Sequence, residues 1–521
     1  MTLAVLACAL LLGAPTPLDP TPPGIPAATR LEFANGLRVV LLENRASPYF
    51  QIELAFAIGA AADPADQIGL ASITGRLLTA GITSPSDLDE DGLARALARL
   101  GAHLNVDVSR DTLTVSGHLP ALRDADVRQF LALFVGVVRR ATLPADRLAR
   151  ELAQRTAQIE AAQDDPATLA DVAIRLAVLG DGPHAWPTFG TLATLPNITR
   201  AAVQRWRDRA LNPAHAVLVV AGAFEPAPLA AWLDANLGDP AWGAGVSCLP
   251  GTHPGTCATL CLAGSPATAL TGPAGPSRAS LATSCLANPS AAPRPPPPAP
   301  TGALYVTTPD EGMTQIQWRA GVANPIAAAS PDYAALRLGL HVLGGDFAAR
   351  LNAHLRTREG LTYGAYLEPE FGAWESAIVT LATDATPATL AHAIGLALAD
   401  LAAATQAPFP ATELEPWRQA LINAFPFRFE TVADTANQYL FIESARLPYT
   451  WLTGWRDALA RPSAAEIQRV LTRVLDPDRL VLVAVGPARL APLLAPDART
   501  VRIVSARDLL TSGLQTATPA R

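Results

Sequence analysis

Alternating apolar and polar positions predict strands early in two separate parts of the chain. Residues 51–59 (QIELAFAIG) alternate as a half-buried strand does, and residues 315–323 (QIQWRAGVA) follow the same pattern. A second pair of apolar strands, each ending in glycine, occupies residues 211–222 and 475–486. Both pairs have the same offset, since 315 − 51 and 475 − 211 each equal 264. The chain therefore contains an internal repeat.

Helical periodicity fills the middle of each repeat. Leu148, Leu152 and Ile159, for example, lie near one face of a helix predicted from about Pro144 to Gln163. Both repeats thus begin with strands, continue with long helices and close with a strand. This order predicts the α+β class, with two homologous halves that each pack helices on a sheet.

Composition marks the boundary between the halves. Residues 243–301 are rich in proline, glycine, serine and threonine, and they end in a run of prolines, which predicts a long linker. The linker separates an N-terminal half, residues 25–242, from a C-terminal half, residues 302–512, which a tail of residues 513–521 follows.

The N-terminal residues and the cysteines indicate export. Residues 1–24 contain an apolar stretch followed by prolines, as a signal peptide and its exit do, and we favour this interpretation over lipid attachment at Cys8. A periplasmic or otherwise exported location follows. Four cysteines in the linker would then form two disulfides, with three possible pairings, and a structural zinc site is the alternative; they are Cys248, Cys257, Cys261 and Cys285.

Charge and composition narrow the class of function. The 521 residues are 50% hydrophobic and 16% charged, which is typical of a folded globular protein. The formal net charge is −7, and arginine is the only basic residue apart from histidine. Nothing in this balance attracts nucleic acid or an anionic membrane. No segment has the ~20 uninterrupted apolar residues of a membrane-spanning helix.

Two homologous halves joined by a long linker resemble the insulinase and pitrilysin family of zinc metallopeptidases, which includes the mitochondrial processing peptidase. Residues 31–42 (LEFANGLRVVLL) are similar to the family's first turn and strand. Asp63-Pro64, residues 69–71 (GLA) and residues 78–81 (LTAG) resemble the segment that surrounds the family's H-x-x-E-H helix. The resemblance covers Leu31 to about Leu510, and it implies the family's clamshell fold.

The zinc-binding motif itself is replaced. In the family, two histidines bind zinc and the glutamate between them activates the metal-bound water. The corresponding positions hold Ser72, Gly75 and Arg76. Serine is a poor zinc ligand, glycine has no side chain to act as a base, and arginine carries a permanent positive charge. The resemblance places a further ligand on a later helix that carries two glutamates seven residues apart; Glu151 fits the first of these, and Gln158 occupies the ligand position. We therefore expect no metal in this chain.

A C-terminal signature of the family is retained. Residues 350–365 (RLNAHLRTREGLTYGA) resemble the segment in which an arginine and a tyrosine, seven residues apart, reach the active site from the second half. The resemblance assigns these substrate-binding roles to Arg356 and Tyr363. We expect Arg356 near the end of a helix that Gly360 terminates, and Tyr363 at the start of a strand. A salt bridge from Arg356 to Glu359 is the structural alternative.

Three hypotheses follow. The first is a non-catalytic, substrate-binding subunit of a heterodimeric zinc endopeptidase of the cell envelope, whose partner brings the zinc. The second is a peptide-binding or scaffold pseudoenzyme without a catalytic partner. The third, an active peptidase with other ligands, predicts stoichiometric zinc in the isolated protein.

Overall fold

The computed structural model describes residues 25–243, 302–371, 377–476, 479–494 and 500–519. The predicted signal peptide, nearly all of the predicted linker and all five cysteines lie outside these residues. Export and disulfide formation therefore stay predictions.

The first half is built on a mixed sheet in the order β1-β2-β8-β3-β7-β6. Strands β2 and β8 are parallel, and the other neighbours are antiparallel. Strand β6 pairs with β7 alone among the described residues, so it forms an edge of the sheet. The strands are β1 (Thr29–Glu32), β2 (Arg38–Glu43), β3 (Tyr49–Phe56), β6 (His103–Val108), β7 (Leu113–Pro120) and β8 (Ala216–Gly222).

The second half repeats this topology. Its sheet has the order β11-β12-β10-β13-β9-β14-β15, in which the parallel strands β9 and β13 match β2 and β8. It differs at one side, because β14 is parallel to β9, whereas β1 is antiparallel to β2. The two repeated sequence patterns fall on β3 with β10 and on β8 with β13, which confirms the predicted repeat. The strands are β9 (Ala303–Thr307), β10 (Ile316–Asn324), β11 (Tyr366–Pro369), β12 (Ala377–Ala385), β13 (Val481–Gly486), β14 (Val501–Ser505) and β15 (Thr518–Pro519). Strand β15 belongs to the stretch that the sequence assigns to the tail.

Helices cover the sheets of both halves. In the first half they are α1 (Leu70–Leu78), α2 (Glu90–Arg99), α3 (Asp124–Arg140), α4 (Ala145–Ala161), α5 (Pro166–Leu179), α6 (Arg200–Ala210) and α7 (Pro226–Leu237), with a small ribbon of β4 (Gly81–Ile82) and β5 (Leu88–Asp89). In the second half they are α10 (Tyr333–Gly344), α11 (Arg350–Asn352), α12 (Leu390–Gln406), α13 (Ala411–Asn423), α14 (Val432–Ser444), α15 (Thr450–Thr453), α16 (Trp455–Ala460), α17 (Ala464–Val474) and α18 (Ala506–Ser512). The α+β class is confirmed.

One helix of each half packs on the sheet of the other half. Helix α5 packs on β10 and β13 of the second half, and α14 packs on β3 and β8 of the first half. Close approach of α5 requires Gly321, because a Cβ there would lie 2.7 Å from Ile174. The hydrophobic cores also join the two halves. Helix α5 shares a core with Val483 of β13, in the second half, and α14 shares a core with Val219 of β8, in the first half. Burial of these faces holds the halves together.

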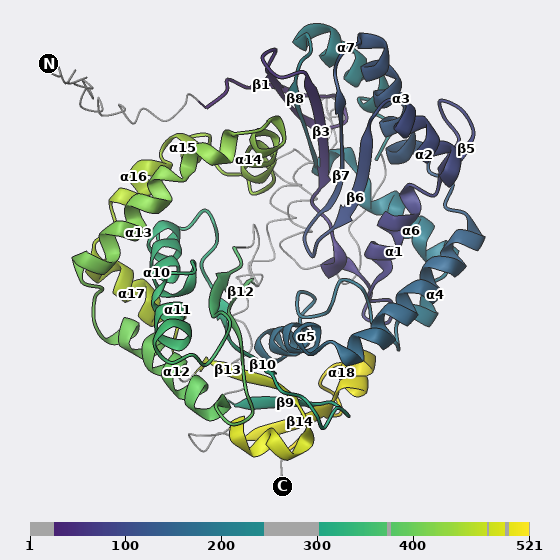
Figure 1. Ribbon diagram of the computed structural model, residues 1–521. Coiled ribbons are helices and arrows are strands. Elements are labelled where there is room, and N and C mark those ends of the chain that lie inside the picture. The colour runs from purple at the N-terminus through teal and green to yellow at the C-terminus, as the bar shows by residue number, and fades with distance from the viewer. Residues whose placement is uncertain (1–24, 244–301, 372–376, 477–478, 495–499, 520–521) are drawn as a thin grey trace, which may run out of the picture.

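The two halves close into a ring in Figure 1, with the first half in purple and blue and the second in green and yellow. Helices α5 and α14 bridge the halves at opposite sides of this ring. No single helix in the described part of the chain is long and apolar enough to cross a membrane. One pair of consecutive helical segments, Leu390–Gln406 and Ala411–Phe429, would be long and apolar enough if taken together, but the two are bent by 93° relative to each other.

Candidate functional site

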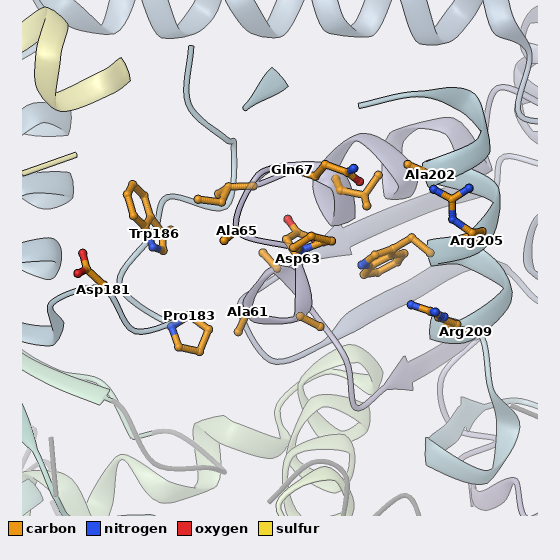
Figure 2. Close-up of a pocket in the computed structure, with 16 residues that line it drawn as sticks. Ala61, Asp63, Ala65, Gln67, Asp181, Pro183, Trp186, Ala202, Arg205 and Arg209 are labelled. Atoms are coloured by element: carbon orange, nitrogen blue, oxygen red, sulfur yellow. The ribbon is translucent and has the colours of Figure 1, made fainter. Parts of the chain in front are cut away.

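Helix α1 carries three of the predicted site positions and is anchored at its start by Asp63. The Asp63 carboxylate accepts hydrogen bonds from the backbone N–H groups of Gly69 and Ala71, both at 2.9 Å. Burial raises the pKa of Asp63 to about 7, although these hydrogen bonds oppose the shift. Figure 2 shows Asp63 between the segment that carries Trp186 and the α6 arginines, where a cavity of about 540 Å³ opens. This cavity lies beside the N-terminus of α1.

Two arginines link α1 to α4. Arg155 of α4 donates a hydrogen bond to the Ser72 hydroxyl at 3.3 Å, and Arg76 lies 3.6 Å from the carboxylate of Glu151. Glu151 is almost fully buried, and Arg147 pairs with it at 2.8 Å. The side chains between the two helices therefore form ion pairs and a hydrogen bond.

Gly75 leaves no room for a side chain. It faces the edge strand β6, and a Cβ at this position would lie 2.7 Å from Cγ2 of Val108 and 3.4 Å from Cγ1 of Val106. Val108 thus occupies the space into which a glutamate at position 75 would extend. The packing around Gly75 therefore leaves no space for a glutamate side chain at this position.

Of the two α4 positions that the sequence singles out, Glu151 contacts α1, and the ligand position of Gln158 stays a prediction. The sequence assigned the ligand position to Gln158 and only a first glutamate to Glu151. In the structure, the α4 side chains that contact Ser72 and Arg76 are those of Arg155 and Glu151, whereas Gln158 is exposed on α4. An α-helix places residues 151, 155 and 158 at successive turns, so only part of this face reaches α1.

The residues present do not suit a metal ion. Among the described residues, no group of three or more histidine, cysteine, aspartate or glutamate side chains is placed to hold one. Arg76 already pairs with Glu151, the only carboxylate in the described residues that contacts α1 side chains here. Zinc in proteins is bound by cysteine thiolates, histidine nitrogens and carboxylates, and Ser72, Gly75 and Arg76 carry none of these groups.

Arg356 lies in the second half on a π-helical turn, residues Ala353–Arg358, that continues α11. Such turns occur often at functional sites. Gly360 follows with a φ of +64°, and the backbone reverses there, as the sequence predicts. Tyr363 differs from prediction, because it lies in a loop three residues before β11. Thr362 holds this loop through hydrogen bonds to Gly364 and Asp384.

The two predicted substrate-binding residues lie together. The Arg356 guanidinium is 5.2 Å from the ring centroid of Tyr363 and 3.9 Å from the ring centroid of Phe347. Arg356 thus contacts two aromatic rings. Its Nη1 is buried without a hydrogen-bond partner among the described residues. The alternative partner, Glu359, lies instead 3.7 Å from His392.

Sequence reasoning missed two members of this site. Phe347 is 55% exposed and precedes the recognised segment by three residues, so only its unusual exposure identifies it. Asn352 is fully buried; its side chain accepts from the N–H of Ala365 at 2.8 Å and donates to the carbonyl of Asp346 at 3.2 Å. It ties together the loops that carry Phe347 and Tyr363. A polar residue inside a predicted helix was the available signal.

The two predicted clusters are separate in this chain. Helix α1, which carries Ser72, Gly75 and Arg76, and helix α11, which precedes Arg356, lie on opposite sides of the ring in Figure 1.

Fold and motifs together define a duplicated α+β peptidase homologue without the zinc motif. Residues 38–191 match the model of the insulinase family, peptidase family M16, and residues 197–421 match that of the peptidase M16 inactive domain. The chain belongs to the insulinase family. No curated protein matches it in sequence.

Solved structures share the fold. A peptidase M16 inactive domain from Pseudomonas fluorescens superposes with a TM-score of 0.71 at 22% identity, covering 89% of this chain and 98% of that one. A protease from Helicobacter pylori gives 0.69 at 15% identity, with 89% and 100% covered. The periplasmic protease PqqL from Escherichia coli gives 0.66 at 13% identity; 91% of this chain matches 49% of PqqL. At these identities the likeness concerns the fold alone.

Proposed function

We propose that this chain is the non-catalytic, peptide-binding subunit of a heterodimeric zinc endopeptidase of the cell envelope. A partner of the same family would supply the zinc, its ligands and the general base. This chain would supply Arg356 and Tyr363 to the partner's active site. A peptide-binding scaffold without a catalytic partner is the alternative.

The arrangement around Arg356 carries the proposal. Its guanidinium is oriented by two aromatic rings, and one of its nitrogen atoms is buried without an acceptor among the described residues. A buried, unpaired donor is costly, and a guanidinium carries several further N–H donors with which it can bind the carbonyl oxygens of a peptide. Tyr363 is 84% exposed, and its phenol is free to donate to an oxyanion on a bound substrate.

The edge strand β6 supports peptide binding in the first half. His103, Asn105 and Asp107 are exposed along this strand, which has one described neighbour, β7. An unpaired strand edge offers backbone N–H and C=O groups to an extended peptide. Such pairing would supply affinity with little dependence on sequence.

An envelope location rests on two further observations. The first 24 residues have the pattern of a signal peptide, and they lie outside the described residues. One structural relative, PqqL, is named a periplasmic protease. The proposed partner would then be exported with this chain.

Coexpression with a zinc-bearing family member from the same genome tests the proposal. We expect Tyr363→Phe to lower kcat for peptide cleavage by about 10²-fold, the usual effect of losing one oxyanion donor. Arg356→Ala should raise KM, because it removes a contact to the peptide backbone.

Matched controls come from the same segment. Arg358→Ala changes an exposed arginine of the same helical turn, and Tyr366→Phe removes the hydroxyl of a nearby exposed tyrosine. Both should leave cleavage unchanged. If the Arg356 and Tyr363 variants cleave like wild type, the assigned roles are wrong. If the homologue cleaves equally well without this chain, while this chain still binds peptides, the scaffold alternative is supported.

A further inference from the structure

Arginines outnumber carboxylates between α1 and α4. Arg76, Arg147 and Arg155 meet there with Glu90 and Glu151, which leaves three positive charges against two negative ones. We call these five residues the arginine cluster. The proposed function does not use them.

Both carboxylates of the arginine cluster are already paired. Arg147 lies 2.9 Å from Glu90 and 2.8 Å from Glu151, so one guanidinium bridges the two. Arg76 approaches the other oxygen of Glu151 at 3.6 Å. Neither carboxylate forms a direct ion pair with a third guanidinium among the described residues.

Arg155 is the third guanidinium. In the described part of the chain its side chain contacts the neutral hydroxyl of Ser72 at 3.3 Å, and no carboxylate lies within 4 Å of it. Burial, and then the charge of Arg76, lower the pKa of Arg155, while the charge of Glu151 opposes this shift. A half-buried cation without a direct ion pair attracts an anion strongly, because the surrounding water that would screen it is reduced.

The cluster is open to a ligand on one side. The Arg76 side chain is 54% exposed, and Gly75, next to it on α1, packs directly against the edge strand β6. A peptide that extends β6 would therefore run close to α1. Guanidinium groups bind carboxylates with charge-assisted hydrogen bonds, and the Ser72 hydroxyl offers a further donor.

We propose that Arg155, Arg76 and Ser72 bind a carboxylate of the peptide. The carboxylate would lie beside α1, the helix that resembles the zinc-binding helix of the family. The carboxylate belongs either to the peptide's C-terminus or to an aspartate or glutamate side chain. This inference rests on the proposed peptide binding and adds a preference for acidic peptides.

Peptide retention on the immobilised full-length protein tests this site. Two libraries of N-acetylated random decapeptides are used, one with a C-terminal carboxylate and one with a carboxamide, and retained peptides are identified by mass spectrometry. The most enriched sequence is then made in both forms, and its affinity is measured by fluorescence anisotropy.

If the C-terminus is the ligand, the acid form should bind about tenfold more tightly than the amide, which corresponds to one charge-assisted hydrogen bond. If a side chain is the ligand, the amidated library should be enriched in aspartate and glutamate. In either case Arg155→Gln should abolish the preference, and Arg155→Lys should retain part of it. Arg150→Gln, on an exposed arginine of the same helix, should retain it fully.

Three outcomes contradict the inference. Equal binding of acid and amide without acidic enrichment removes it and leaves the proposed function intact. A preference that survives Arg155→Gln in a folded variant, as judged by circular dichroism, also removes it. If neither library is retained, peptide binding itself fails, and the proposed function falls together with the inference.

Discussion

Arg175 and Glu370 form a two-pronged ion pair between the halves of the chain. Nη1 and Nη2 of Arg175, on α5, donate to the two carboxylate oxygens of Glu370 at 2.6 and 2.7 Å. Arg110 lies close by, and burial followed by the charge of Arg175 lowers its pKa to about 10. Glu370 therefore neutralises a pair of neighbouring guanidinium groups and fixes α5 to the second half.

Removal of this carboxylate should destabilise the whole chain. We expect Glu370→Gln to lower the free energy of unfolding by about 1–3 kcal/mol, since Arg175 stays buried with its charge unpaired. Urea unfolding followed by circular dichroism measures the change. Asp146→Asn, which removes an exposed partner of Arg150, should cost less than about 0.5 kcal/mol. Equal effects of the two variants would show that the ion pair between halves contributes nothing.

Acid should weaken the fold through His215. Burial, with the charges of Arg446 and Arg38, lowers the pKa of His215 to about 4 from 6.5. Between these values the unfolded chain binds more protons than the folded one, so the free energy of unfolding falls as pH drops from about 6.5 toward 4. The loss should be about 1–3 kcal/mol.

A variant separates this histidine from other acid effects. His215→Gln should unfold with a smaller difference between pH 7.5 and pH 4.5 than wild type does. His392→Gln, on an exposed side chain, should keep the wild-type difference. An unchanged pH dependence in His215→Gln would refute the assignment.

Gly75 and Val108 should be energetically coupled. Alanine at position 75 gains about 1 kcal/mol of helix propensity over glycine, but its Cβ would lie 2.7 Å from Val108. In a Val108→Ala background this clash is relieved. A double-mutant cycle in urea should therefore give a coupling of about 1–2 kcal/mol between the two substitutions. Additive effects would mean that a Cβ at position 75 fits beside Val108 without a clash.

Asn352 should position the aromatic pair. Asn352→Ala removes both hydrogen bonds to Asp346 and Ala365, so we expect a loss of about 1–3 kcal/mol in the free energy of unfolding. Peptide affinity should also fall, because the loops of Phe347 and Tyr363 lose their common tie. Asn423→Ala, at an exposed position of α13, is the matched control and should change neither quantity. Normal peptide affinity in a destabilised Asn352→Ala variant would limit its role to stability.

Local patterns explain the parts of the fold that the sequence predicts well. The helix predicted from about Pro144 to Gln163 is α4, Ala145–Ala161, and Leu148 and Ile159 are buried as the periodicity requires. Helix period and strand alternation are properties of residues close together in the sequence, so they can be recognised without knowledge of the fold. The position of Tyr363 was less predictable, because Thr362 stabilises a loop there and strand β11 begins only at Tyr366.

The sequence by itself determined the duplication, the α+β class and the absence of the H-x-x-E-H motif, since these depend on residue types and spacing. Only the tertiary structure decided that α5 and α14 are exchanged between the halves. It alone brought Phe347 onto Arg356, and it put Arg155 against Ser72. These contacts depend on how helices and sheets distant in sequence pack against each other, and no local pattern encodes that geometry.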